Sequence, residues 1–459
     1  MGRSCFHPAI AAFCLLGGAH PAAAGDIFPY PVHQRSLANG LRVVVVPYDS
    51  PGTVAYLSVV RTGSRDEVEP GKSGFAHFFE HMMFRGTERY SQDAYNEVLK
   101  RMGADSNAFT DDDLTCYYII GPARELATMM DLEADRFQNL EYDEPGFRAE
   151  ALAVRGEYDK SASGPSLPMW ERLSELAFTR HTYGHTTIGY REDIDAMPDQ
   201  YEYSLAFFDR YYRPENVVLV VVGDVQPEQV FAAATNAYGP WQPGYQAPAV
   251  PSEPAQSESK ESHIDWPSPI LPHLLVGFRA PAFSDSTPDT AALDVIAQLL
   301  FAESAPLYQD LVVDKQWVDS LSGGYQDHRD PYLFSVFARV RSGELVPQVL
   351  AAVHAAIAEL QRTPVEEERL ERIKSHLRYG FATRLDTPGA VGFSLARYIA
   401  LTADPMSVNR VYDQYAAISP ADVQRTASAV LVRTAETIVT LSHPEQAAAG
   451  DESEGRSPR

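Results

Sequence analysis

Two histidines and a glutamate stand close together in the segment 74–84, GFAHFFEHMMF. His77 and His81 are four residues apart, so on a helix their imidazole rings lie one turn apart on the same face. Imidazole nitrogens bind Zn²⁺ at about 2.0–2.1 Å, and two such rings can converge on one ion. Glu80 lies on the same side of that helix, where its carboxylate could take a proton from a water molecule. The order H-x-x-E-H is the inverted zinc motif and indicates metal-dependent hydrolysis; the alternative is a pair of ordinary histidines on an amphipathic helix.

A catalytic zinc site usually has three protein ligands, and the third is often a carboxylate. The segment 147–160, FRAEALAVRGEYDK, offers Glu150 and Glu157, which are seven residues apart and would share a helix face with Ala153 and Val154. Burying a carboxylate among small apolar side chains is costly without a partner, and a metal cluster is one such partner. On spacing alone, two exposed glutamates on a solvated helix are the favoured interpretation.

Strands and helices alternate in both halves of the 459-residue chain. Apolar runs predict strands at 41–46, 54–60, 217–222, 274–278 and 437–442, and a helix at 290–302. We therefore expect an α+β fold with two related domains, each a mainly antiparallel sheet covered by helices. The two closing strands each follow a short segment with an arginine and a glutamate, which hints at a duplicated domain.

Composition sets the expected domain boundaries. The stretch 239–262 is rich in Pro, Ser, Gln and Glu and is predicted to be a linker. We expect a metal-bearing domain at 25–238, a metal-free domain at 263–444 and a disordered tail at 445–459.

The N-terminus has the features of an export signal. Arg3 precedes the apolar stretch 9–18, and the small residues Ala22–Ala24 offer a cleavage site, so residues 1–24 are predicted to be a cleaved signal peptide. The expected location is therefore the periplasm or the medium. The apolar stretch is too short to span a bilayer, and we expect no membrane span elsewhere. Of the three cysteines only Cys116 follows the signal, so no internal disulfide is expected and Cys116 is predicted to be a buried strand residue.

The formal net charge is −24. So acidic a surface repels phosphates, which argues against a nucleic-acid partner. The charge fits either a chain kept soluble by self-repulsion or an acidic chamber that favours basic peptides.

The segment 74–87, GFAHFFEHMMFRGT, resembles the core of the pitrilysin/insulinase family, which includes the mitochondrial processing peptidase. The resemblance spans most of the chain and includes the segments 103–118, 181–197 and 207–225. It implies that His77, His81 and Glu157 hold one zinc ion per chain and that Glu80 is the catalytic base. It further implies that Glu150 orients a ligand or tunes the water, and that Asn107 and Ala108 lie on an edge strand that pairs with the substrate backbone.

Family members of this size hydrolyse peptides or unfolded segments inside a chamber, of which one chain forms half of a clamshell. The resemblance therefore predicts a zinc endopeptidase. Two alternatives stay open: a non-catalytic binding or assembly subunit that keeps the fold, and a hydrolase of some non-peptide bond. Zinc is the metal that the resemblance implies. The choice between zinc, manganese and cobalt is decided by the affinity order and by the cellular supply of each metal.

One family feature is missing. Active members carry an Arg and a Tyr, seven residues apart, in the metal-free half, and the register places Val312 and Asp319 at those positions. Tyr325 and Arg329 lie nearby, in the wrong order and at the wrong spacing. Because donors near a developing oxyanion are worth about 10²–10³ in rate, we expect a homologous partner subunit to supply the pair. A homodimer, a shifted register or a substitute residue are the alternatives.

Overall fold

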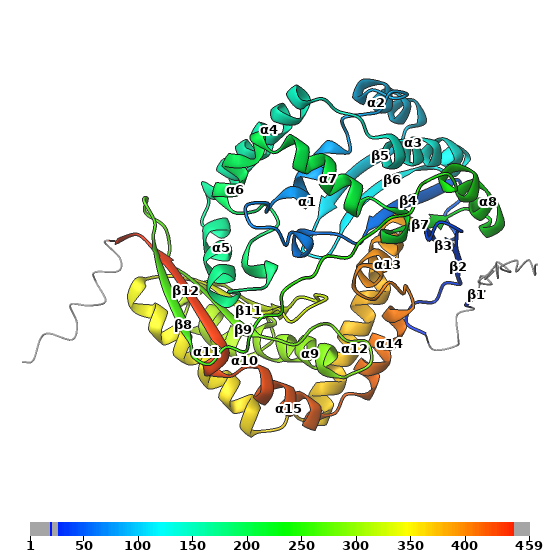
Figure 1. Cartoon of the computed structure of the whole chain (residues 1–459). Coiled ribbons are helices and arrows are strands. Elements are labelled where there is room, and N and C mark those ends of the chain that lie inside the picture. The colour runs from blue at the N-terminus through cyan, green and yellow to red at the C-terminus, as the bar shows by residue number, and fades with distance from the viewer. Residues whose placement is uncertain (1–18, 21–25, 445–459) are drawn as a thin grey trace, which may run out of the picture.

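The computed structural model describes residues 19–20 and 26–444 (Figure 1). The predicted signal peptide at 1–24, apart from the two-residue strand β1 (Ala19–His20), and the predicted tail at 445–459 lie outside the described residues.

The first half of the chain builds a seven-stranded sheet in the order β1-β2-β3-β7-β4-β6-β5. Its strands after β1 are β2 (Val32–Ser36), β3 (Arg42–Pro47), β4 (Thr53–Val60), β5 (Asp105–Thr110), β6 (Thr115–Pro122) and β7 (Val217–Gly223). All neighbours are antiparallel except β3 and β7. Strand β7 is buried along its whole length because its side chains pack alternately into two apolar cores, one on each face of the sheet, which explains its continuous valine run.

The second half builds a five-stranded sheet in the order β10-β11-β9-β12-β8. Its strands are β8 (Lys260–Asp265), β9 (His273–Arg279), β10 (Val318–Tyr325), β11 (Leu333–Val340) and β12 (Glu436–Ser442), and only the β8–β12 pair is parallel. The predicted α+β class with mainly antiparallel sheets is therefore confirmed. Residues 242–257 form no helix or strand, and the last three residues of the predicted linker, 260–262, begin β8.

Helices cover both sheets (Figure 1). Those of the first half are α1 (Phe75–Met82), α2 (Gln92–Met102), α3 (Leu126–Asn139), α4 (Glu144–Ala162), α5 (Ser166–Ala177), α6 (Arg191–Ala196), α7 (Tyr201–Tyr211) and α8 (Pro227–Tyr238). Those of the second half are α9 (Asp289–Phe301), α10 (Pro306–Tyr308), α11 (Val346–Arg362), α12 (Glu367–Arg384), α13 (Pro388–Thr402), α14 (Ser407–Ala417) and α15 (Pro420–Val430). The helix predicted at 290–302 corresponds to α9.

Each half contributes one helix to the sheet of the other half. Helix α13 packs against β4 and β7 of the first sheet, and α5 packs against β9 and β12 of the second; Figure 1 shows α13 rising from the second half toward the first sheet. Gly392 permits the close approach of α13, since a Cβ atom there would lie 2.7 Å from Leu57 Cδ1. The two halves therefore share one large apolar core.

A charged cluster also joins the halves. It forms where the loop between β5 and β6 meets the loop between β10 and β11. His328 lies 2.9 Å from the carboxylate of Asp112, and Arg329 lies 3.0 Å from both Asp66 and Asp113. Since these side chains are buried or nearly so, the ion pairs are shielded from water and hold the loops together.

By length and composition alone, two helical stretches could cross a membrane, Asp289–Asp314 and Gly343–Arg362. The first is 67% buried inside the protein. The second packs one apolar face, with Val349, Val353, Ile357 and Leu360, into the core. Cys116 is a buried free cysteine in β6, as predicted.

Candidate metal centre

Helix α1 is held in place at its first turn. The carboxylate of Glu67 accepts hydrogen bonds from the backbone N–H groups of Gly74, at 2.7 Å, and Ala76, at 2.6 Å. Burial raises the pKa of Glu67 well above its usual value, whereas the two hydrogen bonds and the unpaired N–H groups of the helix N-terminus favour the charged form. Gly74 has a φ of +89°, and a Cβ atom there would lie 2.7 Å from the carbonyl oxygen of Ile188. Only glycine suits this start of the helix.

The opposite faces of α1 have different surroundings. Its apolar residues Phe75, Ala76, Phe78, Phe79 and Met82 are buried in the first half's core. His77 and His81 lie on the remaining face, with ring centroids 4.9 Å apart. The helical spacing therefore places both rings side by side, as predicted.

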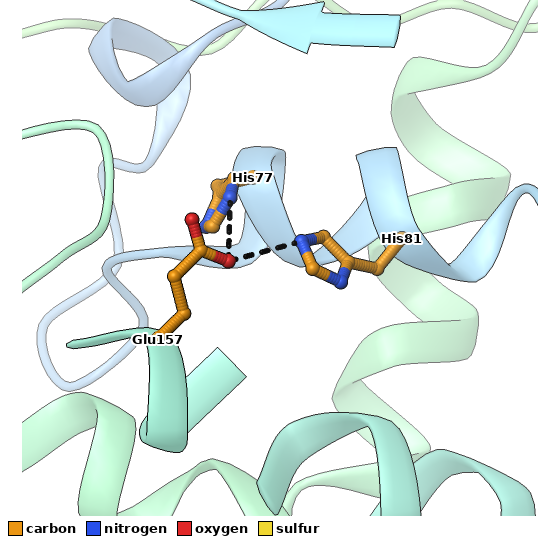
Figure 2. Close-up of side chains that lie close together, drawn as sticks. All are labelled: His77, His81 and Glu157. Atoms are coloured by element: carbon orange, nitrogen blue, oxygen red, sulfur yellow. Dashed lines mark ion pairs between the residues drawn. The ribbon is translucent and has the colours of Figure 1, made fainter. Parts of the chain in front are cut away.

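The carboxylate of Glu157, on α4, lies between the two histidines (Figure 2). Its Oε2 atom is 3.7 Å from Nε2 of His77 and 3.4 Å from Nε2 of His81. One ligand atom from each of the three residues lies within 4.8 Å of the others. The structure thus brings together the three residues that the family resemblance selected.

These three side chains fit a zinc ion. Donor atoms bound to one tetrahedral zinc at 2.0–2.1 Å lie about 3.3 Å from each other, close to the separations seen here. Burial lowers the pKa of His77 to about 4, because the nearby charge of Glu157 only partly opposes desolvation. The imidazole is then neutral at physiological pH, which is the form that binds metal. Two imidazoles and a carboxylate with an open side are typical of a catalytic zinc site.

Glu150 lies seven residues before Glu157 on α4 and contacts the His81 ring. Its Oε1 atom lies 2.9 Å from Nδ1 of His81, and its Oε2 atom accepts a hydrogen bond from Arg85. If Nδ1 donates its proton to this carboxylate, the Nε2 lone pair of His81 is directed toward Glu157 and any bound metal. By contrast, Nδ1 of His77 is buried and has no hydrogen-bond partner within the described residues.

Glu80 lies on α1 between the two histidines. Its Oε2 atom accepts a hydrogen bond of 2.7 Å from the Thr110 hydroxyl at the end of β5. Burial raises the pKa of Glu80 above its usual value, although the hydrogen bond from Thr110 opposes the shift. A hollow of about 690 Å³ opens onto this group and is also lined by His77 and Glu157. A substrate could therefore reach the base and the ligand atoms together.

Asn107 and Ala108 lie on β5, which is the edge strand of the first sheet next to the metal centre. Ala108 N–H bonds to the side-chain oxygen of Asn107 at 2.9 Å. Phe109, the next residue, is 38% exposed and lines the same hollow. An edge strand can add a further strand from another chain, which here would compete with the Asn107 side chain for the Ala108 N–H.

The positions expected to carry Arg and Tyr have other environments. Val312 lies in a helical turn, Gln309–Asp314, and packs against the core. Asp319, on β10, forms an ion pair of 2.7 Å with Arg339. Tyr325 donates a hydrogen bond to the Pro281 carbonyl at 3.0 Å, and Arg329 belongs to the buried charged cluster. Neither nearby residue is free to act as a substitute.

Three supporting residues were missed at the level of sequence. Arg85 follows His81 by four residues, and that helical spacing was an available signal. Thr110 and Glu67 are separated from Glu80 and Gly74 by loops, so no local pattern links them.

Comparisons with known proteins agree with this fold. Residues 43–191 match the family model described as Insulinase (Peptidase family M16), and residues 200–377 match the model described as Peptidase M16 inactive domain. The zinc protease PqqE of Helicobacter pylori is 26% identical, over 90% of this chain and 93% of its own length. The mitochondrial-processing peptidase subunit beta of Dictyostelium discoideum is 25% identical, over 89% of this chain and 88% of its own. A crystal structure of a protease from Helicobacter pylori superposes with a TM-score of 0.83 at 26% identity, covering 90% of this chain and 99% of that one.

The fold is thus that of an M16 peptidase. The chain belongs to peptidase family M16, the insulinase or pitrilysin family.

Proposed function

We propose that this chain is the zinc-bearing subunit of an M16 endopeptidase that hydrolyses peptides or unfolded segments. The observation that carries the proposal is the convergence of His77, His81 and Glu157 beside Glu80, at the wall of an open hollow of about 690 Å³. His77, His81 and Glu157 would hold the ion, one per chain. Bound zinc would supply Lewis-acid polarisation of the scissile carbonyl and of the attacking water.

Glu80 acts as the general base. It accepts the proton of the attacking water and returns it to the leaving amine. Thr110 holds the carboxylate in one orientation through its hydrogen bond. Glu150 positions the His81 ring rather than contacting the substrate.

The substrate pairs with the edge strand β5. An extended peptide that adds to this strand would place its backbone beside Asn107 and Ala108 and run past Thr110 toward Glu80. Such pairing depends on main-chain hydrogen bonds, so it suits polypeptides that are unfolded.

A homologous partner subunit completes the chamber and supplies the missing donors. Val312 and Asp319 cannot stabilise an oxyanion, since one has no donor and the other carries a negative charge already paired with Arg339. A heterodimer with a second M16 chain is the form that we propose, and a homodimer is the alternative. The signal-like N-terminus supports export to the periplasm or the medium.

The test is peptide hydrolysis by the purified chain, alone and with candidate partner chains from the same organism, with zinc content measured on each sample. We expect an unstructured peptide, but no small ester, to be cleaved, and a chelator to remove the activity. Glu80→Gln should abolish cleavage while zinc is retained, and Glu88→Gln, the same change at an exposed glutamate, should leave cleavage unchanged. Zinc-loaded protein that cleaves nothing in any combination would instead support a non-catalytic binding subunit.

A further inference from the structure

A second cavity lies in the metal-free half of the chain. It has a volume of about 600 Å³, opens to solvent and is lined by residues of α9, α12, α13 and α14. Gln298, Arg384, Tyr398 and Tyr412 contribute one side chain from each of these helices to its wall. A volume of this size is typical of sites that bind small molecules or short peptide segments.

Several polar side chains that line this cavity make no hydrogen bond within the described part of the chain. Tyr398 and Tyr412 are only 9% and 6% exposed, yet neither hydroxyl has a hydrogen-bond partner among the described residues. Within the same part of the chain, the side chains of Gln298, His376 and Arg384 also make no hydrogen bond. These donors and acceptors are open to the cavity, so a ligand that enters it can bind them without breaking hydrogen bonds inside the protein.

The charges of the cavity favour an anion. Asp327 is neutralised by an ion pair of 2.6 Å with Arg397. Asp294 accepts a hydrogen bond from Tyr415, and burial, helped by the charge of Asp327, raises the pKa of Asp294 to about 7, so it carries less than a full negative charge near neutrality. Arg384 has no carboxylate partner within residues 26–444. A planar guanidinium without a counter-ion is suited to a carboxylate, which it can bind through two parallel hydrogen bonds.

A smaller hollow lies next to both this cavity and the space around the metal centre. The hollow, of about 250 Å³, shares Asp327, Phe393 and Arg397 with the cavity and Phe109 with the space around His77 and Glu80. The rings of Phe109, on β5, and Phe393, on α13, are 6.0 Å apart. An extended peptide paired with β5 could therefore pass these two rings and end in the cavity.

We propose that this cavity binds a carboxylate of the peptide substrate or product, with Arg384 as its ionic partner and the hydroxyls of Tyr398 and Tyr412 as hydrogen-bond donors. The carboxylate is either the free C-terminus of the peptide or an acidic side chain. That the ligand is a peptide rests on the proposed function, whereas the preference for a carboxylate rests on the cavity alone. Phe381 and Phe393 provide an apolar wall for the neighbouring side chain.

Three blocked tripeptides test the proposal: acetyl-Ala-Ala-Phe with a free carboxylate, the same peptide as its C-terminal amide, and acetyl-Ala-Asp-Ala amide. Binding to the full mature chain is measured by ligand-observed NMR titration, with zinc present and after chelator treatment. We expect a peptide that carries the preferred carboxylate to bind roughly tenfold more tightly than the uncharged amide. Tighter binding of the first peptide assigns the C-terminus, and tighter binding of the third assigns an acidic side chain.

Variants separate the cavity from the metal centre, which could itself bind a carboxylate. Arg384→Gln, at an exposed residue whose replacement should not disturb folding, is expected to remove the preference. Tyr412→Phe should weaken it several-fold. Arg378→Gln, on the same helix but not in the cavity wall, is the matched control and should keep it.

The proposal is overturned if the preference disappears when zinc is removed, if it survives Arg384→Gln, or if no carboxylate-dependent binding is found. Failure of the proposed peptidase activity would look different. In that case the chain would cleave no peptide, but the Arg384-dependent preference would remain and still support the cavity.

Discussion

Glu150 is predicted to set the zinc affinity without touching the metal. Its carboxylate lies 2.9 Å from Nδ1 of His81 and also accepts a hydrogen bond from Arg85. Replacing it by alanine leaves the His81 ring without the partner that selects its tautomer and orientation. We therefore expect Glu150→Ala to bind zinc more weakly, although His77, His81 and Glu157 are all present.

The magnitude follows from the environment of this hydrogen bond. The Glu150 side chain is 10% exposed, so water replaces the lost contact poorly. A hydrogen bond to a charged group contributes about 1.5–3 kcal/mol, and loss of such outer partners costs about 10–100-fold in metal affinity, which is about 1.4–2.8 kcal/mol. Both approaches indicate a similar effect. Glu150→Gln keeps a neutral acceptor and should fall near the tenfold end of this range.

Zinc affinity is measured by competition with a chromogenic chelator at fixed pH, with circular dichroism to check the fold. Glu144→Gln serves as the matched control, since Glu144 lies on the first turn of the same helix and forms an exposed ion pair with Arg148. Wild-type affinity in a folded Glu150→Ala protein would show that the His81 ring is oriented by something other than this carboxylate.

Two further predictions concern stability and the position of α1. Burial lowers the pKa of His328, but its hydrogen bond to Asp112 and the nearby negative charges outweigh this and raise the pKa to about 9. Since the unfolded value is about 6.5, protonated His328 stabilises the fold fully below about pH 6.5 and no longer above about pH 9. The free energy of unfolding of the wild type relative to His328→Gln should therefore fall by up to about 3 kcal/mol between pH 6 and pH 10. Urea titrations at several pH values measure this difference. A difference that is constant or rises with pH would contradict the ion pair. Gly74→Ala should cost about 1–3 kcal/mol of stability because of the positive φ and the clash with the Ile188 carbonyl. It should also weaken zinc binding. Gly103→Ala is the control: its φ is positive but no atom lies within 4 Å of the added Cβ, so this variant should lose stability alone.

Local sequence patterns were sufficient to predict the main strands and the two histidines of the metal centre. The i, i+4 spacing of His77 and His81 predicts two rings on one helical face, because the period of the helix is set by backbone hydrogen bonds and not by the rest of the fold. Valine-rich runs predicted β3, β4 and β7 for a similar reason, since alternating or continuous apolar runs report burial directly. The same kind of local evidence left Glu150 and Glu157 undecided, and only the family resemblance separated their roles.

What the sequence by itself determined is therefore the chemistry of α1 and the class of the fold. The tertiary structure decided which distant groups meet that helix: Glu157 between the two rings, Thr110 on Glu80 and Glu67 at the first turn. It also decided that α5 packs on the second sheet and α13 on the first, and that Arg384 and Tyr412 line one cavity. These contacts join segments far apart in the chain. They depend on how whole layers pack, where many weak apolar contacts act together, and no short stretch of sequence carries that information.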